Sequence, residues 1–236
     1  MKRLIVALIL SGMAFASGAA TYYIKANATD WTAKGNFFTD AGRTQPAAQA
    51  PQAGDVVNMA AGEYAIDGAS ASFATVANLE KIVSTTGVKF VFTVSEGEKE
   101  LGCLIRSGST ANDRKTTTLV KQGAGTLAFT STANDKQICC CSFDVQGGTL
   151  KMPQNTTADQ TYGTLKLAGG TSIWLAASPD SSTSSTFVWV DAAEGSLITN
   201  ATTRSAGHIP RWTRRTSSRR SRARSAAASA SGRPAA

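Results

Sequence analysis

Histidine is almost absent from this sequence, and its absence excludes several kinds of catalytic centre. The single histidine among the 236 residues is His208, which lies in an arginine-rich stretch near the C-terminus. The body of the chain therefore cannot form a Ser-His-Asp triad. Zinc takes four N or S ligands, and the sequence also lacks a C-x-x-C pair, so we expect no metal ligand.

Cysteine is also scarce, with four residues: Cys103 and the run Cys139-Cys140-Cys141. Small disulfide scaffolds are short, cysteine-dense chains with spread spacings, so this pattern excludes that class. In a strand, Cys139 and Cys141 face one way and Cys140 the other, which makes convergence on one ion difficult. The pattern favours buried thiols over a disulfide that includes Cys103, and either of these over a metal or redox centre.

Long apolar runs are missing after the first residues. Lys2 and Arg3 precede the apolar run Leu4–Leu10, and Ala14-Phe15-Ala16 fits an A-x-A cleavage site. This pattern predicts a secretory signal peptide at residues 1–20, and hence a secreted or cell-surface protein. The run is shorter than the ~20 residues that a spanning helix needs. We therefore expect no transmembrane segment in the mature chain.

Basic charge is confined to the C-terminal end. The net charge is +8, but nine Arg and no acid lie from Arg204 onward, which leaves fifteen basic against sixteen acidic residues. Nucleic-acid binding would thus rest on this tail alone. Residues 204–236 are nearly all Arg, Ser and Ala, so we expect them to be disordered. They are either a genuine basic tail or the product of a frameshift that truncated a longer repeat protein.

Glycine recurs at a fixed period through the middle of the chain. Gly102, Gly125, Gly148, Gly170 and Gly195 lie 23, 23, 22 and 25 residues apart, and each precedes a short run with apolar character. A repeat of this length, in a chain rich in Thr, Ser, Gly and Ala, predicts stacked coils with one continuous core. The expected fold class is therefore all-β, as a parallel β-helix or solenoid. A β-sandwich is the alternative, although its turns should come every 8–12 residues or so.

Two segments resemble the autotransporter-associated β-strand repeat. Residues 119–129 and 143–152 match its Lys-x-Gly-x-Gly-Thr-Leu strand and its Val-x-x-Gly-Thr-Leu strand, and Trp31 and Gly54–Asn58 resemble the start of such proteins. The firm match covers about residues 117–152 and a looser one about 54–199. The connecting loop at 133–138, followed by the three cysteines, differs from the usual Asn-Thr-Tyr-x-Gly element. The resemblance implies a right-handed parallel β-helix displayed outside the cell, commonly as the passenger of a type V secretion system.

We expect four regions: the signal peptide at 1–20, an irregular N-terminal capping segment at 21–75, solenoid repeats at 76–203 and the tail at 204–236. Val88, Phe90, Phe92 and Val94 alternate as a half-buried strand should. Residues 76–83 fit either a short helical turn or a strand.

Two groups of side chains and one glycine-containing loop are the candidates for a functional site. Glu96, Glu98 and Glu100 could pair as in glycosidases, but they follow a strand in a polar stretch that indicates a solvated loop. Trp174 and Trp189, with Phe187, could form a platform for sugars, although aromatics in a solenoid more often belong to its core. No phosphate-binding loop is present, since Gly123–Gly125 lacks a following Lys-Ser/Thr.

These observations predict a non-enzymatic secreted or surface-displayed β-solenoid, with no catalytic, cofactor or metal residues. Its role would be structural, adhesive or display, either as an intact protein or as a truncated passenger fragment. Its partner would be a surface glycan or protein that the residues do not identify. The alternative is a β-helix that binds or cleaves polysaccharide.

Overall fold

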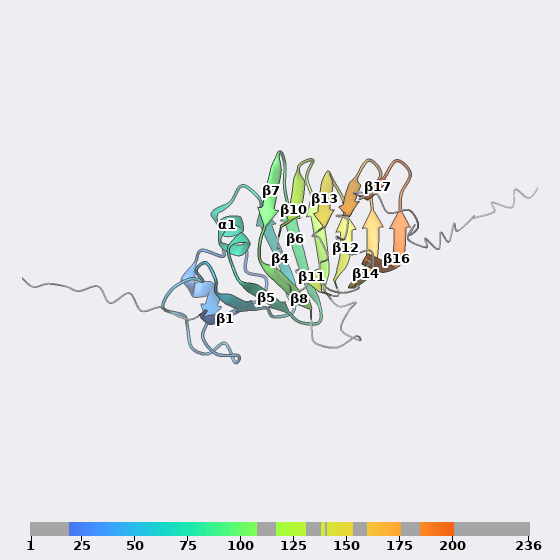
Figure 1. Ribbon diagram of the computed structural model, residues 1–236. Helices are drawn as coiled ribbons and strands as arrows, with labels where there is room; N and C mark the ends of the chain where they lie inside the picture. The colour runs from blue at the N-terminus through green and yellow to red at the C-terminus, as the bar shows by residue number, and fades with distance from the viewer. Residues whose placement is uncertain are drawn as a thin grey trace, which may run out of the picture.

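The chain is nearly all β and winds as a parallel β-solenoid of about four turns (Figure 1). The computed structural model describes residues 19–107, 117–130, 138–139, 141–152, 160–175 and 185–200. Neighbouring turns are joined by parallel strand pairing in three sheets. The predicted solenoid is therefore confirmed, and the alternative β-sandwich, which is built from antiparallel sheets, is wrong.

Between residues 56 and 152 the chain passes through the three sheets in the order A, B, C, whereas the described strands between residues 160 and 200 alternate between sheets B and C. Sheet A contains β2 (Phe37–Phe38), β1 (Thr21–Ile24), β3 (Val56–Asn58), β5 (Lys81–Ser84), β8 (Leu104–Ser107) and β11 (Ile138–Cys139). Sheet B contains β4 (Gly62–Asp67), β6 (Val88–Thr93), β9 (Thr118–Gln122), β12 (Ser142–Val145), β14 (Gln160–Leu167) and β16 (Ser185–Ala192). Sheet C contains β7 (Glu98–Leu101), β10 (Thr126–Phe129), β13 (Thr149–Met152), β15 (Ser172–Leu175) and β17 (Leu197–Asn200). The parallel stacking thus already includes β3 and β4, which precede residue 76.

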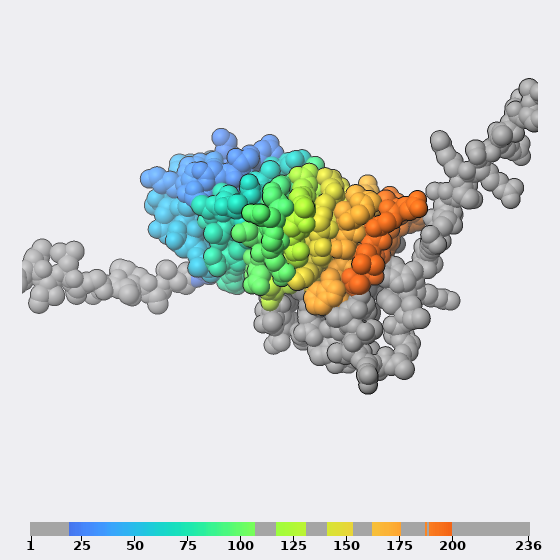
Figure 2. All heavy atoms as spheres, turned by 90° about the horizontal axis from the view of Figure 1, so that it is seen from above, coloured from blue at the N-terminus to red at the C-terminus, as the bar shows by residue number. Residues whose placement is uncertain are grey.

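The core is a set of columns that run through the stacked turns. Because paired residues of parallel strands face the same side, inward side chains lie above one another from turn to turn. One such column on sheet B contains Tyr64, Phe90, Leu119, Phe143 and Leu165, all of them buried. A single turn could not bury these side chains, so the stack is the unit of stability. Figure 2 shows the successive turns as adjacent bands of the surface.

A short helix takes the place of a sheet C strand in the first turn. Helix α1 (Ala71–Ala77) packs against β4 and β7, and the Ser70 hydroxyl caps it by accepting a hydrogen bond from the Phe73 N–H at 3.1 Å. Phe73 and Val76 are buried. The helix lies beside β7, the outermost strand of sheet C, and so protects that edge from pairing with other chains (Figure 1). The ambiguous stretch at 76–83 is split between the end of α1 and β5.

The N-terminal end of the core is closed by aromatic side chains. Trp31 is fully buried and lies within about 6 Å, between ring centroids, of Phe37, Tyr64 and Phe90. The 3-10 helix η1 (Lys34–Asn36) leads directly into β2, which pairs antiparallel with β1. This segment covers the first turn as a terminal cap must.

The glycine period marks the corners that lead into sheet C, with one correction. Gly125, Gly148, Gly170 and Gly195 precede β10, β13, β15 and β17, but Gly102 precedes β8, which belongs to sheet A. The true counterpart before β7 is Gly97, whose φ of 64° matches the 62° of Gly148. Gly97, Gly148, Gly170 and Gly195 have a left-handed φ, which favours glycine. At Gly125 crowding requires glycine instead, because a Cβ there would lie 2.8 Å from the Gly97 carbonyl oxygen.

Two predicted regions lie wholly or mainly outside the described residues: the signal peptide, described only at residues 19 and 20, and the tail at 204–236. Within the described part of the chain, no helix is long and apolar enough to cross a membrane.

Candidate functional site

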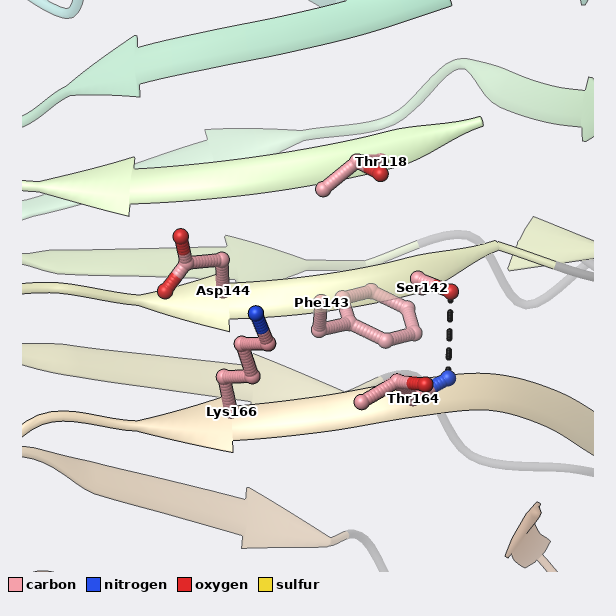
Figure 3. A pocket seen from close by; sticks show the side chains of 6 residues that line it. All are labelled: Thr118, Ser142, Phe143, Asp144, Thr164 and Lys166. Carbon is pink, nitrogen blue, oxygen red and sulfur yellow. Dashed lines mark hydrogen bonds between the residues drawn. The ribbon is translucent and has the colours of Figure 1, made fainter. Parts of the chain in front are cut away.

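A shallow depression lies on the outer face of sheet B, with a volume of about 230 Å³ (Figure 3). Strands β9, β12 and β14 supply its walls, which consist of Thr118, Ser142, Phe143, Asp144, Thr164 and Lys166. The strand register places the hydroxyls of Thr118, Ser142 and Thr164 in one row across the three strands. Neighbouring members of such a row lie about 4.8 Å apart along the solenoid axis.

A second row of charged side chains runs beside the hydroxyls. The register aligns Asp144 on β12 with Lys166 on β14 and Asp191 on β16. Figure 3 shows the Lys166 side chain extending toward the strand that carries Asp144. Because one lysine lies between two carboxylates, this part of the surface has little net charge.

Hydrogen bonds hold several of these groups in place. The Ser142 hydroxyl accepts from the Thr164 backbone N–H at 3.0 Å. The Asp144 carboxylate accepts from Gln146 Nε2 at 2.8 Å, and Gln146 Oε1 accepts from Gln122 Nε2 at 2.9 Å. Each bond restricts a side-chain rotamer, so the face presents its polar groups in a defined arrangement.

Trp189 extends the hydroxyl row by one strand. It pairs in register with Thr164, and 50% of its surface is exposed. The expectation that Trp189 lies in the core is therefore wrong. That expectation holds for Phe187, which packs against the core with ring centroids 5.1 Å from Tyr162 and 6.0 Å from Phe143.

Trp189 and Phe187 lie on opposite faces because the alternation of inward and outward side chains is broken in β14. Tyr162 is buried whereas Thr164, two residues later, lines the outer depression. Inward and outward positions therefore shift by one residue across Gly163, as they do when a strand carries an extra residue. The paired strand β16 follows the same shift, which places Phe187 inward and Trp189 outward.

Trp174 lies on a different face, the outside of sheet C, and is also exposed, by 37%. Its ring centroid lies 5.9 Å from Lys151 Nζ, which in turn binds the Glu98 carboxylate at 2.5 Å. That ion pair spans β10 on the face that carries Ala128, and Ala128 is buried. The core expectation was wrong for Trp174 as well, and the two tryptophans do not form one platform.

The acidic stretch is only partly the loop that its polarity predicts. Glu98–Leu101 forms strand β7, with Glu98 and Glu100 exposed, while Glu96 lies in the preceding turn. Glu98 has a cationic partner in Lys151, which makes it a member of a surface ion pair.

Lys121, the lysine of the repeat-like motif, points into the core. It is 2% exposed, and its Nζ donates to the carbonyl oxygens of Gln122 and Gly123 at 2.8 Å and of Gly147 at 3.1 Å. Burial lowers the pKa of Lys121 to about 8. At neutral pH the ammonium therefore keeps three N–H donors, one for each carbonyl of two successive corners.

The described cysteines fit the prediction of buried thiols. Cys103 and Cys141 are both fully buried, and burial raises the pKa of the Cys103 thiol to about 12. Cys140 and the side chain of Cys139 lie outside the described residues. Among the residues that the structure describes, no group of three His, Cys, Asp or Glu side chains is placed to hold a metal ion.

Comparison with family models, with curated proteins and with solved structures finds no match. The fold itself defines the class of this chain as a parallel β-solenoid.

The hydroxyl row was missed by the sequence reasoning, although a signal exists. Thr118, Ser142 and Thr164 each stand one residue before an inward apolar side chain, at spacings of 24 and 22 residues. This second period lies on the strands, whereas the glycine period lies at the corners.

Proposed function

We propose that this chain is a secreted or surface-displayed, non-enzymatic β-solenoid related to the autotransporter-associated repeats, whose role is adhesive or structural. The observation that carries the proposal is the contrast between the two sides of its strands. The inward positions form an apolar core that also contains the buried, charged side chain of Lys121, whereas sheet B presents hydroxyl, amide and charged groups in rows on its outer face. Such a face suits contact with an extended partner, namely a glycan or protein surface.

The motif residues support the relation to that repeat class. Lys121, Gly123 and Gly125 meet at one corner, where the lysine binds carbonyls and the glycines accept close backbone contacts. The lysine and the two glycines of the Lys-x-Gly-x-Gly part of the motif thus each have a physical role at this corner. Export rests on the residues of the leader, with Lys2, Arg3 and the run Leu4–Leu10 as its signal.

Polysaccharide cleavage is the second candidate function. The described carboxylates support it less well than they support a non-enzymatic role. A catalytic acid of a glycosidase needs a raised pKa. Within the described residues, the carboxyls with a clear shift are Asp30 and Asp40, and the pKa of each is lowered by hydrogen bonds, chiefly from the Thr32 side chain and the Gln45 backbone respectively.

Expression of the full chain in a Gram-negative host tests this function. We expect the leader to be removed and the protein to reach the outside of the cell, where particles coated with it adhere to cell surfaces. A variant in which Leu4–Leu10 is interrupted by charged residues should stay in the cytoplasm. Retention of the unaltered chain inside the cell, or release of reducing ends from polysaccharide, would contradict the proposal.

A further inference from the structure

We propose that the outer face of sheet B binds a neutral oligosaccharide across β9, β12, β14 and β16, with one sugar ring stacked on Trp189. This proposal rests on the adhesive function above and gives it a site and a ligand class.

The arrangement of side chains carries the first step. Thr118, Ser142 and Thr164 place three hydroxyls in one line, and Trp189 continues that line on the next strand. Three of these four residues line the depression, and the fourth exposes half of a large, flat ring beside it. A ligand along this line would cross the strands and run parallel to the solenoid axis.

The chemistry of these groups selects sugars. Hydroxyls both donate and accept hydrogen bonds, and the Gln122–Gln146–Asp144 chain adds fixed amide and carboxylate groups beside the row. A pyranose offers hydroxyls at its rim and a C–H face that packs on an indole ring. Such a site combines one aromatic surface with a few oriented polar groups, as ligand sites generally do.

Local charge excludes a polyanion at this site. The hydroxyl row continues from Thr118 to Lys89 on β6 and Glu63 on β4. Together with Asp144, Lys166 and Asp191 of the charged row, this gives three acids against two lysines. Nucleic acids and sulfated glycans require clusters of Lys and Arg to neutralise their charges. An uncharged polysaccharide does not require such a cluster.

Sheet C offers an internal comparison. Trp174 is also exposed, but Lys151 lies near its ring and is itself bound by Glu98. Sheet C also has a row of hydroxyls, from Thr126, Thr149 and Ser172, but those of Thr149 and Ser172 hydrogen-bond to each other at 2.7 Å. The polar groups of that face are therefore engaged with one another, whereas on sheet B an exposed indole continues the hydroxyl row itself. Trp174 therefore serves as a matched control for Trp189.

The experiment is affinity electrophoresis of the full chain through gels that contain dextran, soluble starch, hydroxyethylcellulose or galactomannan, with heparin as the polyanionic probe. At least one neutral polysaccharide should retard the chain. Trp189→Ala should weaken that retardation at least tenfold, Ser142→Ala should weaken it several-fold, and Trp174→Ala should change it less than twofold. Far-UV circular dichroism of each variant reports whether the fold is kept, and quenching of tryptophan fluorescence by the retarding glycan, lost in Trp189→Ala, gives a second measure.

Three outcomes would overturn the site: no retardation by any neutral probe, equal losses in the two tryptophan variants, or binding to heparin only. If Trp189→Ala abolishes glycan binding while coated particles still adhere to cells, the site stands and adhesion uses another surface. If the chain binds glycan but is never exported, the site stands and the proposed function fails.

Discussion

Gly148 stacks directly on Gly125, and a Cβ on Gly148 would overlap the Gly125 carbonyl oxygen. The corners of successive turns are thus packed backbone against backbone. Gly170 occupies the next corner with a similar φ of 76°, but a Cβ there would meet nothing within 4 Å. These two positions separate the effect of crowding from the effect of the left-handed conformation.

We expect Gly148→Ala to lower the free energy of unfolding by roughly 2–5 kcal/mol, because it combines the left-handed conformation with overpacking. Gly170→Ala should cost only about 1–2 kcal/mol, since conformation alone opposes it. Urea denaturation followed by circular dichroism measures both. Equal costs for the two variants would show that the corner relaxes and that contact with Gly125 is unimportant.

Trp31 should be the main hydrophobic anchor of the N-terminal cap. It is fully buried against Phe37, Tyr64 and Phe90, so Trp31→Ala should cost about 3–5 kcal/mol in unfolding free energy. Within the described residues its Nε1 has no hydrogen-bond partner, so Trp31→Phe loses no such bond and should cost clearly less. Denaturation midpoints of the two variants decide this, and a Phe variant as unstable as the Ala variant would show that the indole is required.

Lys121 should make stability depend on pH in the alkaline range. Its pKa is lowered by burial to about 8 from an ordinary value of 10.5. Between these values the unfolded chain holds a proton that the folded chain has released, so rising pH favours the folded state. Below pH 8 both states are protonated, and this contribution does not change with pH.

The comparison with Lys121→Met isolates this effect. At pH 7 the variant should be less stable by roughly 1–3 kcal/mol, because three carbonyl oxygens lose their donor. As pH rises from 8 to 10.5, the wild-type chain should gain stability relative to the variant. A difference that stays constant or shrinks over this range would contradict burial as the dominant influence on the amine.

Cys103 should not react with alkylating reagents in the folded chain. Its side chain is fully buried and burial raises its pKa to about 12, so hardly any thiolate exists at pH 8. After mild reduction, iodoacetamide should leave the Cys103 peptide unmodified in buffer and alkylate it in denaturant. Peptide mass mapping shows the result, and rapid labelling of the native chain would mean that the turn at β8 opens readily.

Much of the architecture was accessible from local sequence signals. The glycine period and the alternation of Val88, Phe90, Phe92 and Val94 depend on backbone conformation and side-chain direction, which are properties of single turns and strands. They were sufficient to predict a parallel solenoid, and the structure confirms it. Gly102 misled because a glycine period alone does not say which of the three corners a residue occupies.

The candidate site, in contrast, was decided by tertiary structure. Simple alternation puts Phe187 and Trp189 on one face, but the shift across Gly163 in the paired strand turns one inward and the other to solvent. Likewise, a lysine is expected on the surface from sequence alone. Lys121 is buried because two successive corners supply carbonyl oxygens for its ammonium. The sequence by itself determined the repeat and the core, because these follow from local backbone geometry. The register between turns decided which side chains meet on the outer face, because it depends on pairing between residues more than twenty positions apart.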